Sequence, residues 1–322
     1  MTKVLGMGNA LVDIMTRLDN ESYLELFELP KGSMILVDRD RSDRVMKGTT
    51  HLEKIMASGG SAANTIHGLA RLGIETAFVG KIGHDEIGEI FRQDLLKSGI
   101  KPLLSYSDTE SGRAVALVSP DAERTFATYL GAAVELSDTD LSASLFPGYD
   151  YFHIEGYLVQ NHKLLERAVE LARQGGLKIS LDMASYNVVE ENLDFLKRIV
   201  KDYIDIVFAN EEEARVFTGQ GPEKALDIIA RDCDIAVVKT GSKGSLIRHG
   251  DDVFKIGIIP VRNIDSTGAG DLYASGFIYG LAKGLTLAEC GRIGSVLAGK
   301  VLEVMGPKLD EKGWEEAVRL IS

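Results

Sequence analysis

The chain has 322 residues, of which 45% are hydrophobic and 26% charged, as in one or two globular domains whose core needs no disulfide or metal. Its formal net charge of −12 opposes binding to nucleic acid or to an anionic membrane. Cys233 and Cys290 stand in no metal-ligand spacing, no signal peptide is readable at the start, and no apolar run approaches the ~20 residues that span a bilayer. We therefore expect a cytoplasmic protein without a zinc site.

Short apolar runs alternate with helical patterns along most of the chain, which predicts an α/β fold with parallel strands and crossover helices. From Ala269 onward the pattern is almost entirely helical. The runs that predict buried strands are 4–8, 77–82, 151–154, 179–183, 204–209 and 235–239. The helical patterns between them include 61–72, 85–97, 162–173 and 223–231.

Two regions depart from this alternation. Residues 113–130 predict an antiparallel hairpin around a turn at Pro120 and Asp121, and residues 10–17 and 34–38 are extended pieces with no helix between them. A small sheet standing off the main body would account for both regions and would help an enzyme to exclude water. An extension of the main sheet accounts for them equally well.

The segment from Asp265 to Asp271 reads Asp-Ser-Thr-Gly-Ala-Gly-Asp and leads into a helix. Side chains are nearly absent at Gly268, Ala269 and Gly270, so an anion can approach the backbone N–H groups where the helix dipole favours negative charge. Asp271 falls in the first helical turn and can accept a proton from an attacking hydroxyl, which suits phosphoryl transfer. A helix-capping acid after a tight glycine turn is an equally good interpretation of this segment alone.

An earlier glycine pair, Gly59 and Gly60, also opens a helix, and Asn64 lies one turn later. Glycines let a ligand approach the backbone, and an amide side chain both donates and accepts hydrogen bonds. Asp13 follows the first strand and could accept hydrogen bonds from a vicinal diol. Taken singly, Asn64 is more simply a polar helix residue and Asp13 a turn acid.

Two further motifs follow predicted strands. Asn210 and Glu213 could hold Mg²⁺ through its water shell or could form a capping box, and both can be true. The segment from Lys239 to Gly244, which includes Thr240 and Gly241, could contact nucleotide phosphate or ribose or could form a hairpin turn. No Walker A sequence is present, and the segment 6–11 is an incomplete dinucleotide fingerprint, which disfavours a nicotinamide oxidoreductase.

Taken together, the Gly59-Gly60…Asn64 segment and the Asp265-to-Asp271 segment resemble the two signature regions of the PfkB, or ribokinase-like, kinases. The resemblance implies one three-layer α/β/α domain over residues 1–322, with a mostly parallel central sheet. It also implies a β-sheet lid formed by insertions at about 10–50 and 103–130. The implied activity is ATP-dependent phosphorylation of an alcohol by a monomer or homodimer.

The resemblance also implies roles for individual residues. Asp271 would be the catalytic base, and Gly268, Ala269 and Gly270 would form the anion hole. The remaining positions would hold the sugar hydroxyls, the nucleotide and Mg²⁺, and also K⁺, which some members of the family bind. These are Asp13, Gly59, Gly60 and Asn64 for the sugar; Thr240, Gly241, Gly244 and Asn210 for the nucleotide; Glu213 for Mg²⁺ through water; and Asp265 and Thr267 for K⁺.

Within the family, residues 6–14 and 31–38 are most similar to the adenosine kinase branch. A purine could pack on Met34 and Leu36, although Met34 replaces an expected polar side chain, and Arg124 matches a lid arginine that meets phosphate. The expected reaction is therefore conversion of adenosine to AMP with MgATP. A sugar kinase of the ribokinase or fructokinase type is the alternative, and a non-catalytic nucleoside- or sugar-binding protein comes third.

Overall fold

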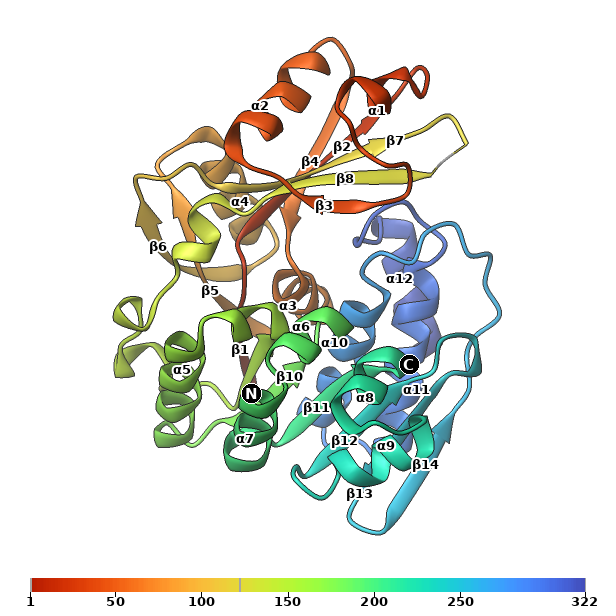
Figure 1. Cartoon of the computed structure of the whole chain (residues 1–322). Helices are drawn as coiled ribbons and strands as arrows, with labels where there is room; N and C mark the ends of the chain where they lie inside the picture. Colours follow the sequence, from red (N-terminus) through yellow and green to blue (C-terminus); the bar gives the residue numbers. More distant parts are fainter. Residues whose placement is uncertain (1, 122, 322) are drawn as a thin grey trace.

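The computed structural model describes residues 2–121 and 123–321, which form one large and one small sheet (Figure 1). The large sheet has nine strands: β1 (Lys3–Met7), β5 (Glu75–Gly83), β6 (Ile100–Ser107), β9 (Tyr151–Glu155), β10 (Lys178–Asp182), β11 (Ile206–Asn210), β12 (Ile235–Lys239), β13 (Ser245–His249) and β14 (Asp252–Ile256). Their order is β14-β13-β12-β11-β10-β9-β1-β5-β6. The pairs from β6 to β12 are parallel, and β13 and β14 are antiparallel.

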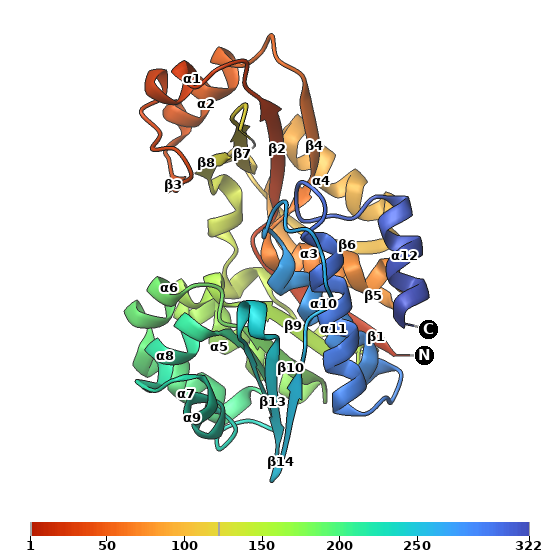
Figure 2. The same cartoon turned by 90° about the vertical axis from the view of Figure 1, so that its right-hand side faces the viewer.

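Helices cover both faces of the large sheet, because its central strands are apolar on both sides. One face carries α3 (Ser61–Arg71), α4 (Glu86–Lys97), α10 (Ala269–Ala282) and α11 (Leu287–Val301). The other carries α5 (His162–Gln174), α6 (Tyr186–Glu191), α7 (Leu193–Tyr203), α8 (Glu211–Thr218) and α9 (Pro222–Ile229). Along β1, Leu5 and Met7 pack on the side of the sheet that carries α5 to α9, whereas Val4 packs on the side that carries α3, α4, α10 and α11. This three-layer arrangement, visible edge-on in Figure 2, confirms the expected fold class.

The remaining helices are peripheral. α12 (Glu311–Ile321) packs on α11 through Trp314 and Ala317. Five short 3₁₀ helices lie in connections: η1 (Gly131–Glu135), η2 (Asp138–Asp140), η3 (Ala143–Leu145), η4 (Gly156–Gln160) and η5 (Gly241–Lys243). Within the described ranges, no helix is both long and apolar enough to cross a bilayer.

The small sheet is separate from the large one, which decides between the two interpretations of the extended regions. It contains β2 (Leu11–Arg17), β3 (Met34–Leu36), β4 (Lys54–Gly59), β7 (Gly112–Val118) and β8 (Arg124–Tyr129), in the order β3-β8-β7-β2-β4. The helices α1 (Ser22–Leu26) and α2 (Arg39–Gly48) cover its outer face, where Phe27, Val45, Val115 and Leu117 form a core of their own. Its inner face looks toward the large sheet (Figure 1).

The expected hairpin is formed by β7 and β8. The expected lid segments need correction at two boundaries. The segment from 103 begins inside β6, which pairs with β5 in the large sheet. The segment 10–50 stops before β4, which pairs with β2 in the small sheet.

Candidate functional site

A cleft of about 1560 Å³ lies between the inner face of the small sheet and the carboxyl ends of the large sheet's parallel strands. The carboxyl ends of strands in open α/β sheets are the usual place for ligands. Most residues that the sequence singles out line this cleft. The exceptions are Gly59, Ala269, Thr240, Gly244 and Asp265, which do not line it.

The glycine-rich segment forms the start of α10 at the floor of the cleft. Gly268 is the N-cap and has φ +77°, and a β-carbon there would lie 2.7 Å from Pro307 Cα, so only glycine fits. The first N–H groups of a helix have no carbonyl partner one turn back. Ala269 N donates to Ser266 O at 3.3 Å, while Gly268 and Gly270 line the cleft itself.

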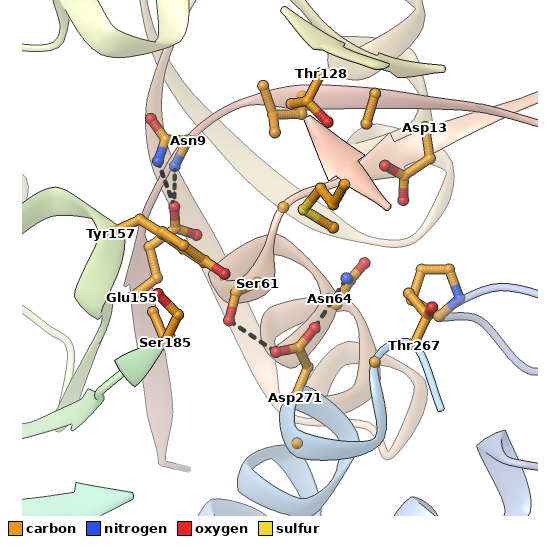
Figure 3. Close-up of a pocket in the computed structure, with 18 of the residues that line it drawn as sticks. Asn9, Asp13, Ser61, Asn64, Thr128, Glu155, Tyr157, Ser185, Thr267 and Asp271 are labelled. Atoms are coloured by element: carbon orange, nitrogen blue, oxygen red, sulfur yellow. Dashed lines mark hydrogen bonds between the residues drawn. The ribbon is translucent and has the colours of Figure 1, made fainter. Parts of the chain in front are cut away.

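Asp271 lies in the first turn of α10, as the sequence predicts. Ser61 Oγ donates to its Oδ1 at 2.7 Å and Asn64 Nδ2 donates to its Oδ2 at 3.0 Å (Figure 3). Burial raises the pKa of Asp271 to about 6 and Asp182 adds to the rise, although the two hydrogen bonds oppose it. The carboxylate is therefore fixed in place and able to accept a proton near neutral pH.

Asp13 faces the same space from β2, on the wall opposite Asp271 (Figure 3). Burial raises the pKa of Asp13 to about 6, with Lys308 opposing the rise. A β-carbon on Gly59 would lie 2.4 Å from the Asp13 carboxylate, so this glycine makes room for the acid. Asn64 Oδ1 is buried without a hydrogen-bond partner among the described residues, and so offers an acceptor to a ligand.

Sequence reasoning missed a buried carboxylate at the end of β9. Glu155 Oε1 accepts from Asn9 N at 2.9 Å and from Asn9 Nδ2 at 2.7 Å, and Oε2 accepts from Ala62 N at 2.9 Å (Figure 3). Burial raises its pKa to about 7. The available signal was a lone acid directly after a predicted strand. Residues 6–11 lead from β1 into β2 and not into a helix, which excludes the dinucleotide fingerprint.

A second group lies at the ends of β10 and β12, and of its members the sequence did not reveal Asp182. Lys239 Nζ donates to Asp182 Oδ2 at 2.7 Å, and both residues line the cleft. Burial raises the pKa of Glu213 to about 7, and the nearby carboxylate of Asp182 adds to the rise. The carboxylates of Asp182, Glu213 and Asp271 thus lie around one lysine.

Asn210 and Glu213 form the capping box that the sequence suggested. Asn210 Oδ1 accepts from Glu213 N at 2.9 Å, and Glu213 Oε2 accepts from Asn210 N at 2.7 Å. Both residues also line the cleft. The structural interpretation is confirmed, and a role toward Mg²⁺ stays a prediction.

The segment after β12 is a hairpin turn. Thr240 N and Oγ1 both donate to Gly244 O, at 2.7 and 2.9 Å, and Gly241 and Gly244 have positive φ angles of 56° and 93°. Gly241 is the member of this set that reaches the cleft. Contact with a nucleotide stays a prediction.

Asp265 and Thr267 shape the loop before α10. Asp265 Oδ1 accepts from Thr267 N at 3.0 Å, Oδ2 accepts from Gly306 N at 2.7 Å, and Arg124 from β8 forms an ion pair with the same carboxylate. The loop is thereby tied to the small sheet. A K⁺ ion at Asp265 stays a prediction.

The part of the cleft under the small sheet is apolar. Met34 and Leu36 on β3 are 66% and 63% exposed, and they line the cleft together with Phe126 from β8. Tyr157, which sequence reasoning also missed, lines the same cleft from η4. The cleft therefore has an apolar region in addition to the polar floor around Asp271.

Comparison with known proteins gives these features a family. Residues 37–312 match the family model described as pfkB family carbohydrate kinase. Adenosine kinase from Sinorhizobium meliloti has the same fold, with 32% sequence identity and a TM-score of 0.86. A probable sugar kinase from Rhizobium etli CFN 42 also has this fold, with 33% sequence identity and a TM-score of 0.84. Each comparison covers 99% of both chains. An uncharacterized sugar kinase from Archaeoglobus fulgidus is 29% identical over 247 residues, 75% of this chain and 96% of the relative.

Proposed function

Because this chain belongs to the pfkB family of carbohydrate kinases, and is thus a phosphotransferase, we propose that it phosphorylates a primary hydroxyl of a nucleoside with ATP. The favoured substrate is adenosine, with AMP as the product. The apolar region of the cleft is the observation that carries this choice.

A flat base fits that region better than a free sugar does. Met34 and Leu36 are mostly exposed and line the cleft there, and Phe126 adds an aromatic ring, while Tyr157 lines the same cleft beside Glu155. Burying such surface against a purine is favourable, whereas a sugar alone would place hydroxyl groups there without partners. Thr128 Oγ1, buried on β8 without a partner among the described residues, can bond the edge of the base.

The polar floor suits the sugar of the same nucleoside. Asp13 and Asn64 Oδ1 offer acceptors to sugar hydroxyls, and Asp271 is placed to take the proton of the primary hydroxyl. The acceptor oxygen then forms its bond to the γ-phosphorus as the bond from that phosphorus to the ADP oxygen breaks. N–H groups at the start of α10 stabilise the charge of the transferring group.

The charge of the cleft fits a nucleotide bound with Mg²⁺. Asp182, Glu213 and Asp271 bring three carboxylates to one lysine, so a divalent cation would restore the balance. Within the described residues, no three acidic, histidine or cysteine side chains are grouped as direct ligands, which favours binding through water at Glu213 and Asn210. The ion would neutralise phosphate charge when bound.

The small sheet would act as a lid over this cleft. Its inner face presents apolar side chains, and Arg124 on β8 already reaches the loop before α10. Closure over a nucleoside would exclude water from the transferring phosphoryl group.

A coupled ADP-release assay with a panel of nucleosides and sugars tests the proposal. We expect adenosine to give the highest kcat/KM, with ribose and fructose at least about a hundredfold lower, since they cannot fill the apolar region. Turnover of a sugar with no turnover of any nucleoside would reject the nucleoside assignment in favour of a sugar kinase. Binding of adenosine without ADP release would instead indicate the non-catalytic alternative.

A further inference from the structure

Lys239 lies directly beside the start of α10. It is the last residue of β12, and its side chain, 17% exposed, reaches the floor of the cleft. A β-carbon on Gly270 would lie 3.0 Å from Lys239 Nζ. The ammonium group therefore rests against the glycine that lets an anion approach the helix.

The surrounding acids keep this lysine charged. Burial alone lowers the pKa of Lys239, but the carboxylates of Asp182, Glu213 and Asp271 outweigh burial and hold the pKa above its usual value. Asp182 is its one hydrogen-bond partner within the described ranges, at 2.7 Å. An ammonium group has three donors, so two remain for a ligand.

The partner acid is held by a strained turn. Asp182 Oδ1 accepts from Ala184 N at 3.0 Å, and Ala184 has φ +65°, a left-handed conformation that is rare for a residue with a β-carbon. Such strain persists where the surroundings enforce it and is frequent at functional sites. Ala184 lines the cleft, as Asp182 and Lys239 do.

We propose that Lys239 is a catalytic residue whose ammonium group donates hydrogen bonds to the oxygens of the phosphoryl group in transfer. It acts beside the N–H groups at the start of α10, and Asp182 aims it. The acceptor oxygen bonds to phosphorus, the bond to the ADP oxygen breaks, the acceptor proton passes to Asp271, and Lys239 keeps its own proton throughout. The inference rests on the kinase activity and is independent of which acceptor is used.

Three variants separate this role from that of a structural ion pair. Lys239→Met keeps the length of the side chain but removes its charge, Asp182→Asn keeps an acceptor for Lys239, and the double variant removes both charges. If Lys239 contacts the transferring group, the kcat of both Lys239→Met and the double variant should fall about 10²–10³-fold, which is the usual effect of removing one such hydrogen-bond donor. The KM of the acceptor should stay within about threefold, and Asp182→Asn should stay within about tenfold of native kcat.

A structural pair gives a different pattern. Lys239→Met would then have a low kcat because Asp182 is left buried and unpaired, and kcat would return toward the native value in the double variant. Recovery in the double variant, or native kcat in Lys239→Met, overturns the proposal. Should Lys239→Met fail to fold, the double variant decides, since it does not leave a charged Asp182 without its hydrogen-bonded lysine.

The control is a lysine at the opposite end of the same sheet. Lys178 pairs with the buried Asp205 at 3.0 Å at the start of β10, far along the strand from Asp182. Lys178→Met should keep native kcat. Absence of turnover in the native protein would reject the kinase function itself, whereas native turnover that survives in Lys239→Met rejects only the role of this lysine.

Discussion

Asp13 and Asp271 both line the cleft but differ in their hydrogen-bond partners. Asp271 accepts hydrogen bonds from Ser61 and Asn64, whereas the Asp13 carboxylate accepts none within the part of the chain that the structure describes. Lys308, which donates to Asp94 Oδ2 at 2.7 Å, supplies the charge that most strongly favours ionised Asp13. Asp13 is thus a charged acceptor left free for a ligand, which agrees with the predicted diol site.

Replacement of Asp13 should weaken acceptor binding. Asp13→Ala removes hydrogen bonds from two hydroxyls to a charged group, so the KM for the acceptor should rise at least about tenfold while the KM for ATP changes little. Steady-state kinetics with each substrate varied in turn measures both constants. Asp19→Ala, exposed beyond the end of β2, is the control. An unaltered acceptor KM in Asp13→Ala would refute the diol site.

Single residues of the site were predictable to different degrees. Asp271 and the glycines before it form a dense local motif, so their chemistry could be inferred without a fold. Glu155 and Asp182 each end a strand as a lone polar residue, which is equally common at solvent-exposed strand ends. Their roles depend on which strands are neighbours, and that is a tertiary property.

At the scale of elements, two chain crossings join the large and small sheets close to Glu155. Gly60 connects β4 to α3 with φ +96°, and a β-carbon there would lie 2.3 Å from Asn9 O, on the other crossing. Glu155 binds both crossings, through Asn9 and Ala62. The position of the small sheet therefore depends on close backbone contact at Gly60.

Gly60→Ala should be much more damaging than the same change at the other end of α3. Gly73 also has a positive φ, +81°, but nothing lies within 4 Å of a β-carbon there. Gly73→Ala should cost about 1 kcal/mol from backbone strain alone, and Gly60→Ala should cost more because of the overlap with Asn9. Denaturation midpoints and kcat measure both effects. Equal losses in the two variants would show that the crossing is not tightly packed.

Most elements were predictable, and the exceptions have a physical reason. Continuous apolar runs gave the buried parallel strands, and the alternating hairpin gave β7 and β8. The neighbours of β6 and β4 were not predictable, because strand pairing between distant segments leaves little trace in local sequence. For the same reason, the sequence left open whether the extended regions formed a second sheet.

At the scale of the whole molecule, a protein with a net charge of −12 concentrates buried acids at its cleft. Burial raises the pKa of Glu155 and Glu213 to about 7, above their values in an unfolded chain. Near pH 7 the folded protein therefore holds protons that the unfolded chain has released. Raising the pH removes protons from the folded state alone, so stability must fall.

The free energy of unfolding should decrease by on the order of 0.5–1 kcal/mol between pH 7 and pH 8.5. Burial lowers the pKa of His67 and His153 to about 3 and 4, and these groups oppose the trend weakly just above pH 7 and more strongly at lower pH. Chemical denaturation at several pH values measures the slope. Glu155→Gln should flatten it, while Glu170→Gln, exposed on α5, should not. Stability that rises over this range would contradict the burial of these acids.

The most direct test of the whole account is the turnover number of Asp271→Asn in the ADP-release assay, with the best acceptor from the panel. The change keeps the shape of the side chain and removes its ability to accept the acceptor proton. We predict a loss of about 10²–10⁴ in kcat, with the KM values for acceptor and ATP within a few-fold of native. A kcat equal to that of the native enzyme would contradict the assignment of Asp271 as the base.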